Sequence, residues 1–207
     1  MGQDSDTSIE PPLRIGLFGG TFDPPHRGHV AVVADVADAL DLDQVLWIPA
    51  GQPPHKASLS TAPLVLRLEM THAVIGVDSR FKLSRIEAQR MGISYTVETA
   101  YALKGGCPEA KLFLIIGTDQ IRKLHLWKDP ERLLSLVELV VMDRGGQSGA
   151  EHVPNVPGAE NAHFVPVRKI DISSTDVRVA VNDGQNVSTL VPAAVEEIIV
   201  REGLYRI

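Results

Sequence analysis

Residues 13–29 read LRIGLFGGTFDPPHRGH, and this stretch sets the expectation for the fold. Residues 13–18 are a short apolar run with proline before it and glycine after it, which is typical of a buried strand. The apolar residues that come next repeat at helical spacing and predict a helix over residues 28–40: Val30, Val33, Ala34 and Ala37. A buried strand therefore leads through a glycine turn into a helix.

The same alternation continues along the chain. Buried-strand patterns occupy residues 44–49, 81–84, 111–116, 137–142 and 163–167. Helical patterns occupy residues 63–75, 94–103, 120–136 with an interruption near Pro130, 174–182 and 192–202. This order predicts an α/β fold, a Rossmann-like doubly wound parallel sheet with helices on both faces. Such folds bind ligands beyond the carboxyl ends of the strands, where the strand order reverses.

Two segments fall outside this alternation. Residues 1–12 are polar and acidic and are expected to form a disordered lead-in, so a single domain over residues 13–207 is predicted. Residues 143–161 are rich in Gly, Pro, Gln and Ser without apolar periodicity, which predicts a mobile surface loop.

Composition narrows the classes of function. The formal net charge of -6 argues against general binding to nucleic acid or to an anionic membrane surface. No apolar run reaches the roughly 18 residues that a membrane-spanning helix needs. Cys107 is the only cysteine, which excludes an intrachain disulfide and a cysteine-rich zinc site. We therefore expect a soluble protein of a reducing, cytoplasmic compartment.

The glycines and histidines after the first strand predict a phosphate site. Gly19 and Gly20 let the backbone approach a ligand, and Gly28 separates His26 from His29 at the start of a helix. Two imidazoles and a helix amino terminus suit a phosphate whose charge rises during displacement. Two histidines three residues apart could instead form a helix cap or bind zinc. Thr21 and Asp23 also suit a turn or cap.

A second motif, ISSTDVR over residues 172–178, places hydroxyl groups before a helix and Arg178 one turn inside it. Free amides, hydroxyl groups and a guanidinium fork together suit a polyphosphate. Considered alone, Ser-Ser-Thr-Asp is more often an ordinary helix cap.

Together the two motifs resemble the His-x-Gly-His and Ile-Ser-Ser-Thr-x-x-Arg signatures of the nucleotidyltransferase superfamily, which shares its fold with class I aminoacyl-tRNA synthetases. The resemblance implies that His26 and His29 contact the α-phosphate of ATP and that Ser173, Ser174 and Arg178 hold the departing pyrophosphate. The implied catalytic residues are His26, His29 and Arg178. The implied ATP-binding residues are Gly19, Gly20, Thr21, Phe22, Gly28, Gly117, Asp119, Ile172, Ser173 and Ser174.

Further stretches resemble the bacterial nicotinate-mononucleotide adenylyltransferases over nearly all of residues 13–205: PPHK at 53–56, SYTVET at 94–99, IGTD at 116–119, WK at 127–128 and GLY at 203–205. The resemblance implies that the pyridine ring of the acceptor stacks on Trp127 and that its carboxylate meets the backbone near Tyr95 and Thr96. Lys56 and Arg144 would hold the acceptor phosphate. The family usually has Pro-Gly after this arginine, whereas Gly145-Gly146 follows here.

Each of these positions also has a simpler interpretation. Trp127 suits the core, Lys56 suits a solvated loop, Thr96 suits the first turn of a helix, and Asp119 suits a helix cap as well as a ribose contact.

The implied reaction is attack by the phosphate of nicotinate mononucleotide on the α-phosphorus of ATP, giving deamido-NAD and pyrophosphate. Mg²⁺ is expected to arrive with ATP, because no carboxylate cluster indicates a separate metal site. ATP and nicotinate mononucleotide are then the binding partners, and a homo-oligomer remains open. The alternatives are phosphopantetheine adenylyltransferase and a non-catalytic nucleotide-binding module on the same fold.

Overall fold

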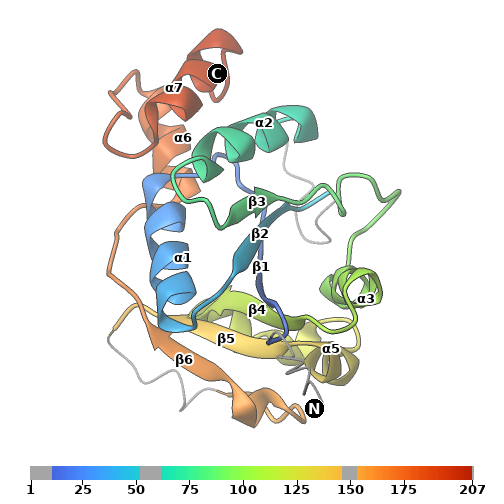
Figure 1. The fold of residues 1–207 in the computed structure, drawn as a ribbon. Coiled ribbons are helices and arrows are strands. Elements are labelled where there is room, and N and C mark those ends of the chain that lie inside the picture. The colour runs from blue at the N-terminus through green and yellow to red at the C-terminus, as the bar shows by residue number, and fades with distance from the viewer. Residues whose placement is uncertain (1–10, 52–61, 146–152, 207) are drawn as a thin grey trace, which may run out of the picture.

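The computed structural model describes residues 11–51, 62–145 and 153–206. Its centre is a six-stranded sheet in which every neighbouring pair of strands is parallel, in the order β3-β2-β1-β4-β5-β6. The strands are β1 (Arg14–Gly20), β2 (Gln44–Pro49), β3 (Phe81–Leu83), β4 (Lys111–Gly117), β5 (Glu138–Asp143) and β6 (His163–Pro166). Consecutive strands run outward from β1 and then from β4, so the strand order reverses between these two (Figure 1).

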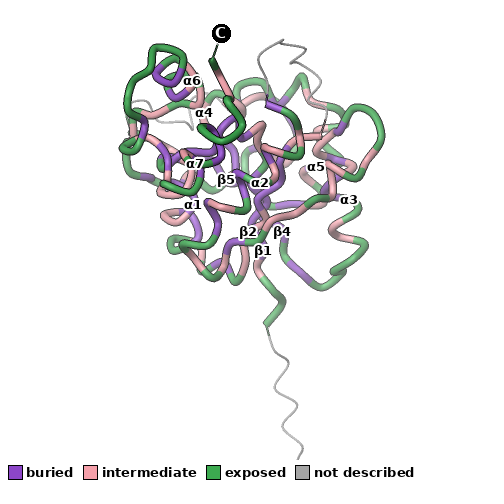
Figure 2. The backbone as a smooth tube through the Cα atoms, turned by 90° about the horizontal axis from the view of Figure 1, so that it is seen from above, coloured by how far each residue is buried: buried purple, intermediate pink, exposed green. Residues whose placement is uncertain are grey.

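Helices cover both faces of the sheet because neighbouring residues of each strand point to opposite faces. In β4, Phe113 and Ile115 pack on one side, whereas Leu112, Leu114 and Ile116 pack on the other. The first side is covered by α1 (Arg27–Ala39), α2 (Leu64–Ile75), α6 (Ser174–Asn182) and α7 (Ala193–Arg201). The second side is covered by α3 (Thr96–Gly106), α4 (Thr118–Ile121) and α5 (Pro130–Leu136). Figure 2 shows buried backbone through the central strands and exposed backbone at the outer turns. The predicted doubly wound sheet is confirmed.

The helical stretch expected over residues 120–136 is interrupted near Pro130 as predicted, but the prediction is wrong before that point, because the chain also changes direction after α4. The helix α4 is followed by a 3₁₀ turn, η1 (Leu124–Leu126), and then by α5. Trp127 is extended and Asp129 has a positive φ of 45°. Pro130 stands at the first position of α5, where its missing N–H costs nothing. The proline therefore begins a new helix.

The expected surface loop over residues 143–161 is wrong for residues 153–161. These residues include a second 3₁₀ turn, η3 (Ala159–Asn161), and they bury Val156 and Ala159 against the α3–α5 side of the sheet. Gly158 has a φ of 92° and lies against Leu134 of α5. Two buried apolar residues in a polar segment were enough to fix it. Residues 146–152 lie outside the described part of the chain, as do residues 1–10 of the expected lead-in.

Two further bounds differ from expectation. The helix expected from residue 94 begins at Thr96, and it continues through Gly105 to Gly106 instead of ending before them. Among the described residues, no helix is long and apolar enough to cross a membrane.

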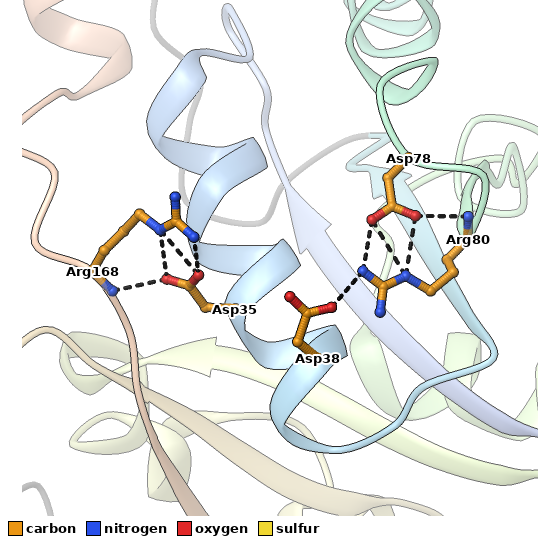
Figure 3. Close-up of polar contacts among 5 residues, drawn as sticks. All are labelled: Asp35, Asp38, Asp78, Arg80 and Arg168. Atoms are coloured by element: carbon orange, nitrogen blue, oxygen red, sulfur yellow. Dashed lines mark hydrogen bonds and ion pairs between the residues drawn. The ribbon is translucent and has the colours of Figure 1, made fainter.

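Two ion-paired groups hold the second half of α1 (Figure 3). The carboxylate of Asp35 accepts from the Nε, Nη2 and backbone N–H of Arg168, and these hydrogen bonds lower the pKa of Asp35. The guanidinium of Arg80 lies 2.8 Å from Asp38 and 2.7 Å from Asp78. Arg168 stands in the connection from β6 to α6, so the first of these pairs helps to place the segment that carries Ser173 and Arg178 beside α1.

Candidate functional site

The residues expected to bind ATP lie at the carboxyl ends of β1 and β4, next to the start of α6. The strand β1 ends at Gly20 and β4 ends at Gly117, and the two strands are neighbours at the point where the order reverses. A Cβ added at Gly19 would meet no atom within 4 Å, so the backbone there is open to a ligand. A Cβ at Gly20 would lie 2.9 Å from the ring of Phe22, which explains the second glycine.

His26 and His29 cap α1 reciprocally. The backbone N–H of His29 donates to Nδ1 of His26 at 3.3 Å, and the backbone N–H of His26 donates to Nδ1 of His29 at 3.2 Å. The two rings stack with their centroids 3.7 Å apart. The helix-cap interpretation of this pair is therefore correct as local structure. Because both Nδ1 atoms accept hydrogen bonds, each neutral imidazole carries its proton on Nε2, which is the nitrogen that can donate to a ligand.

Both imidazoles are held neutral at physiological pH. Burial lowers the pKa of His26 to about 4, and the positive charge of Arg144 acts in the same direction. Burial also holds the pKa of His29 well below its usual value, and His26 and Arg144 lower it further. Protonation would in addition convert each capping Nδ1 from an acceptor to a donor. The two imidazoles are therefore neutral hydrogen-bond donors that lie within the influence of the positive charge of Arg144.

Gly28 and Phe22 fix the geometry of the pair. A Cβ at Gly28 would lie 2.9 Å from Nδ1 of His26 and 3.3 Å from Ile170, so only glycine fits between the ring and the β6–α6 connection. Phe22 is buried with a φ of 49°, and its ring meets that of His29 edge-on at 5.4 Å. The side chain of Phe22 thus supports His29, and only its backbone is available to a ligand.

The second motif lies against the first. Ser173 is the N-cap of α6 and forms a capping box with Asp176. Ser174 donates through Oγ to the carbonyl of Pro24 at 2.8 Å, and Arg178 donates through Nη1 to the carbonyl of Asp23 at 2.8 Å. The two hydrogen bonds therefore join residues that are 150 and 155 positions apart in the sequence. Ile172 is half-buried before Ser173 and packs on the α1 side of the sheet.

Three of the residues expected to bind the acceptor, Tyr95, Thr96 and Trp127, form a second group at the amino terminus of α3. Lys128 lies 2.7 Å from Glu98 of α3 and 4.2 Å above the ring of Tyr95, which brings the neighbouring Trp127 to the amino terminus of α3. Trp127 is half-buried on the α3–α5 side of the sheet, so the core interpretation holds for part of its ring. Thr96 is the first residue of α3, and the side chain of Tyr95, the N-cap residue, makes no capping hydrogen bond. Lys56 lies outside the described residues.

Arg144 and Asp119 occupy the carboxyl ends of β5 and β4. Arg144 is exposed, and its charge acts on both histidines, so it faces the first group of residues. Gly145 has a φ of 76°, which proline cannot adopt, so the turn after Arg144 differs from one built on Pro-Gly. Asp119 is exposed in the first turn of α4, where Gly117 is the N-cap, and it accepts from the side chain of Gln120. It is therefore not the cap of α4.

Sequence reasoning missed the residues that hold these loops together. Arg67 of α2 is 3 % exposed and donates to the carbonyls of Thr21, Ala50, Gly51 and Ala62. Asp23 is buried and accepts from the hydroxyl of Tyr205 and from the backbone N–H of Ala62. The sequence signal for Arg67 was a lone arginine among apolar residues of a helix, which is usually a solvated charge.

Comparisons with known proteins show the family of this chain. A family model described as cytidylyltransferase-like matches residues 17–180. A Thermus thermophilus protein named "Probable nicotinate-nucleotide adenylyltransferase" is 42% identical to this chain over 195 residues, which cover 94% of this chain and 100% of that protein. A Rubrobacter xylanophilus protein of the same name is 40% identical and covers 94% of this chain and 92% of its own.

A solved structure shares the fold. The Plasmodium falciparum nicotinic acid mononucleotide adenylyltransferase complexed with NaAD has a TM-score of 0.76 at 18% identity, over 93% of this chain and 97% of that one. With the matched family model and relatives of about 40% identity over nearly the whole length, this chain belongs to the cytidylyltransferase-like family, among the nicotinate-nucleotide adenylyltransferases.

Proposed function

We propose that the protein transfers the adenylyl group of ATP to nicotinate mononucleotide, giving nicotinate adenine dinucleotide and pyrophosphate, as a step of NAD biosynthesis. The observation that carries the proposal is the direct contact between the two phosphate motifs, through Ser174 to Pro24 and Arg178 to Asp23. The names of the relatives supply the acceptor.

In the proposed complex the triphosphate lies between the two motifs. Gly19 and Gly20 admit its backbone-facing oxygens, with Thr21 and Gly28 in the same turn, and the Nε2 protons of His26 and His29 meet the α-phosphate. Arg178, Ser173 and Ser174 hold the β- and γ-phosphates, and to donate to them the two hydroxyl groups turn from their present acceptors, the Asp176 carboxylate and the Pro24 carbonyl. Asp119, after Gly117, is placed for a ribose hydroxyl. These roles follow from position at the carboxyl ends of β1 and β4 and from the neutral, donating state of the imidazoles.

The acceptor approaches from the α3 end. Tyr95, Thr96 and Trp127 bind its nicotinate ring, and Lys56 and Arg144 hold its phosphate. A phosphate monoester is already ionised at neutral pH, so its oxygen attacks the α-phosphorus without a general base. The protein contributes alignment of the two substrates and donors for the charge that develops on the α-phosphate oxygens. Pyrophosphate leaves on the opposite side.

Mg²⁺ enters this proposal as part of the substrate. Within residues 11–51, 62–145 and 153–206, no group of three or more His, Cys, Asp and Glu side chains is arranged to hold a metal ion. In the proposed complex the cation is bound chiefly by triphosphate oxygens, as Mg²⁺ commonly is. The ion would offset charge on the leaving pyrophosphate. We place the reaction in the cytoplasm, which a chain with a single cysteine suits, and treat assembly into an oligomer as open to sizing measurements.

The test is pyrophosphate release from ATP and Mg²⁺ with three acceptors in turn: nicotinate mononucleotide, nicotinamide mononucleotide and phosphopantetheine. We expect nicotinate mononucleotide to give the highest kcat/KM. A higher kcat/KM with phosphopantetheine would replace nicotinate mononucleotide as the acceptor. Binding of ATP without pyrophosphate release with any of the three acceptors would favour a non-catalytic module.

The role of His29 is tested by His29→Asn, which keeps an oxygen that can accept the N–H of His26. Loss of a donor to the α-phosphate should lower turnover by ~100-fold with little change in ATP binding. His72→Asn, at an exposed position of α2, is the matched control. Unchanged turnover in His29→Asn would contradict the proposed role.

A further inference from the structure

We infer that Arg67 is a positioning residue that sets the distance between the ATP motif and the acceptor group, an inference that rests on the proposed function. Its side chain is 3 % exposed, although it lies on α2 and outside the two groups described above. An arginine is seldom buried unless its N–H groups are matched by acceptors, because desolvation of the charge is costly. What Arg67 bonds to therefore indicates its role.

Its guanidinium joins the loops that follow two neighbouring strands. Nη1 donates to the carbonyl of Thr21, after β1, and to the carbonyl of Ala50, after β2, both at 2.8 Å. Nη2 donates to Gly51 at 3.4 Å, and Nε donates to Ala62 at 3.2 Å. Thr21 belongs to the ATP motif, whereas Gly51 and Ala62 are the described residues on either side of positions 52–61, which contain Lys56 in the sequence.

The link continues from Gly51 to the acceptor group. The backbone N–H of Gly51 donates to the Glu87 carboxylate, and a Cβ at Gly51 would lie only 2.5 Å from the Glu87 carbonyl, so the two segments are in close contact. Glu87 in turn accepts from the Thr99 hydroxyl of α3 at 3.0 Å. One unbroken set of contacts thus runs from Thr21 through Arg67 and Gly51 to α3, whose first residue is Thr96.

Asp23 supplies the opposite charge beneath this set of contacts. Burial lowers the pKa of Arg67, and the charge of Asp23 opposes that effect and favours the ionised guanidinium. Asp23 Oδ1 also accepts from Ala62 at 3.0 Å and from Tyr205 at 2.8 Å. Among the described residues no carboxylate lies within ion-pair distance of Arg67, so its hydrogen bonds all go to loop carbonyls. A planar guanidinium with donors on three nitrogen atoms fixes where the loops lie relative to each other. A lysine, whose donors all lie on one nitrogen atom, cannot do so.

The decisive variant is Arg67→Lys, which keeps the charge and loses most of the fork. We expect kcat to fall by ~10- to 100-fold, as misalignment of two reactants by about 1 Å can produce, while the affinity for each substrate measured alone changes by less than about 3-fold. If Arg67 served stability alone, its substitution would lower the melting temperature without lowering kcat at unchanged substrate affinity.

Thr71→Val is the matched control. Thr71 is fully buried on α2, and its Oγ1 donates at 2.7 Å to the carbonyl of Arg67, a hydrogen bond within the helix and not to either loop. The control should lose stability and keep kcat within about twofold of the original protein. Equal losses of kcat in Thr71→Val and Arg67→Lys would overturn the inference, as would a folded Arg67→Lys protein with unchanged kcat.

Two further measurements keep the test independent of folding and of the proposed reaction. Methylguanidinium added to Arg67→Ala should restore part of kcat in protein that circular dichroism shows to be folded already without it, and no restoration counts against the inference. Amide hydrogen exchange without substrates should be faster at residues 20–23 and 50–51 in Arg67→Lys than in Thr71→Val, and equal exchange counts against it. If the original protein releases no pyrophosphate, the proposed function fails while the exchange result still decides on Arg67.

Discussion

The stacked histidines predict how stability depends on pH. His26 has a folded pKa of about 4 and an ordinary value of 6.5. The unfolded chain therefore binds a proton that the folded chain rejects. This contribution to stability is fully present above about pH 6.5, is lost as the pH falls toward 4, and stays constant below that. His29 changes stability in the same direction, because its pKa is also lowered.

The magnitude follows from those two values. The linkage relation gives a loss of about 2 kcal/mol for His26 between pH 7 and pH 5, and about 3 kcal/mol once the pH is well below 4. The carboxylates with lowered pKa values, such as Asp35 and Asp78, are ionised at pH 5 and lose their contribution only at lower pH. Burial raises the pKa of Glu87, but that carboxyl is present in the original protein and in a His26 variant alike, so the difference between the two proteins over pH 7 to pH 5 reports on His26.

The assay is urea unfolding of the original protein and of His26→Asn at pH 7 and pH 5 and low ionic strength. Asparagine is a good N-cap and has no charge to gain, so the variant should lose about 2 kcal/mol less over this interval. His72→Asn, at an exposed position, should lose as much as the original protein. Identical losses in all three proteins would refute the derivation of the neutral pair from burial.

Four other substitutions test the segments around the pair. Gly28→Ala should lower stability by about 1 kcal/mol and reduce turnover, because the new Cβ would lie 2.9 Å from Nδ1 of His26 and disturb the cap. Gly19→Ala has open space around the new Cβ, so this variant should fold normally and bind ATP more weakly in calorimetry. Asp35→Asn should cost about 0.5 kcal/mol, since Arg168 is 60% exposed, and should raise the KM for ATP; a cost that persists unchanged at high salt would contradict an ionic origin. Tyr205→Phe should destabilise by about 1 to 2 kcal/mol in urea, because Asp23 loses a buried donor, and a neutral result would show that this hydrogen bond adds nothing.

Much of the fold could be predicted from the sequence because apolar periodicity reports local structure directly. The strands and helices around β1, β2 and β4 came from such patterns, and the glycine turn placed the site at the carboxyl end of β1. The prediction failed where the chain changed direction after α4, and where two buried residues, Val156 and Ala159, fixed a polar segment.

The site was predicted in part. Residue types and spacing found the two motifs, since phosphate chemistry depends on glycines, histidines and helix termini that are visible in sequence. The reciprocal cap of His26 and His29 was considered only as a rival to a functional role, whereas one ring nitrogen serves the cap and the other is left to donate. Arg67 was not found, because its acceptors are backbone carbonyls, which every residue has and no pattern marks.

The contacts of Ser174 and Arg178 with Pro24 and Asp23 have a consequence for how the protein is made. During translation residues 19–29 are made early, and Ser174, Arg178 and Tyr205 follow at least 150 residues after their partners Pro24 and Asp23. Long-range contacts of this kind form late in folding. A chain still being translated therefore carries the entire first motif before α6 can contact it, and we expect nucleotide to bind tightly only once α6 has been made.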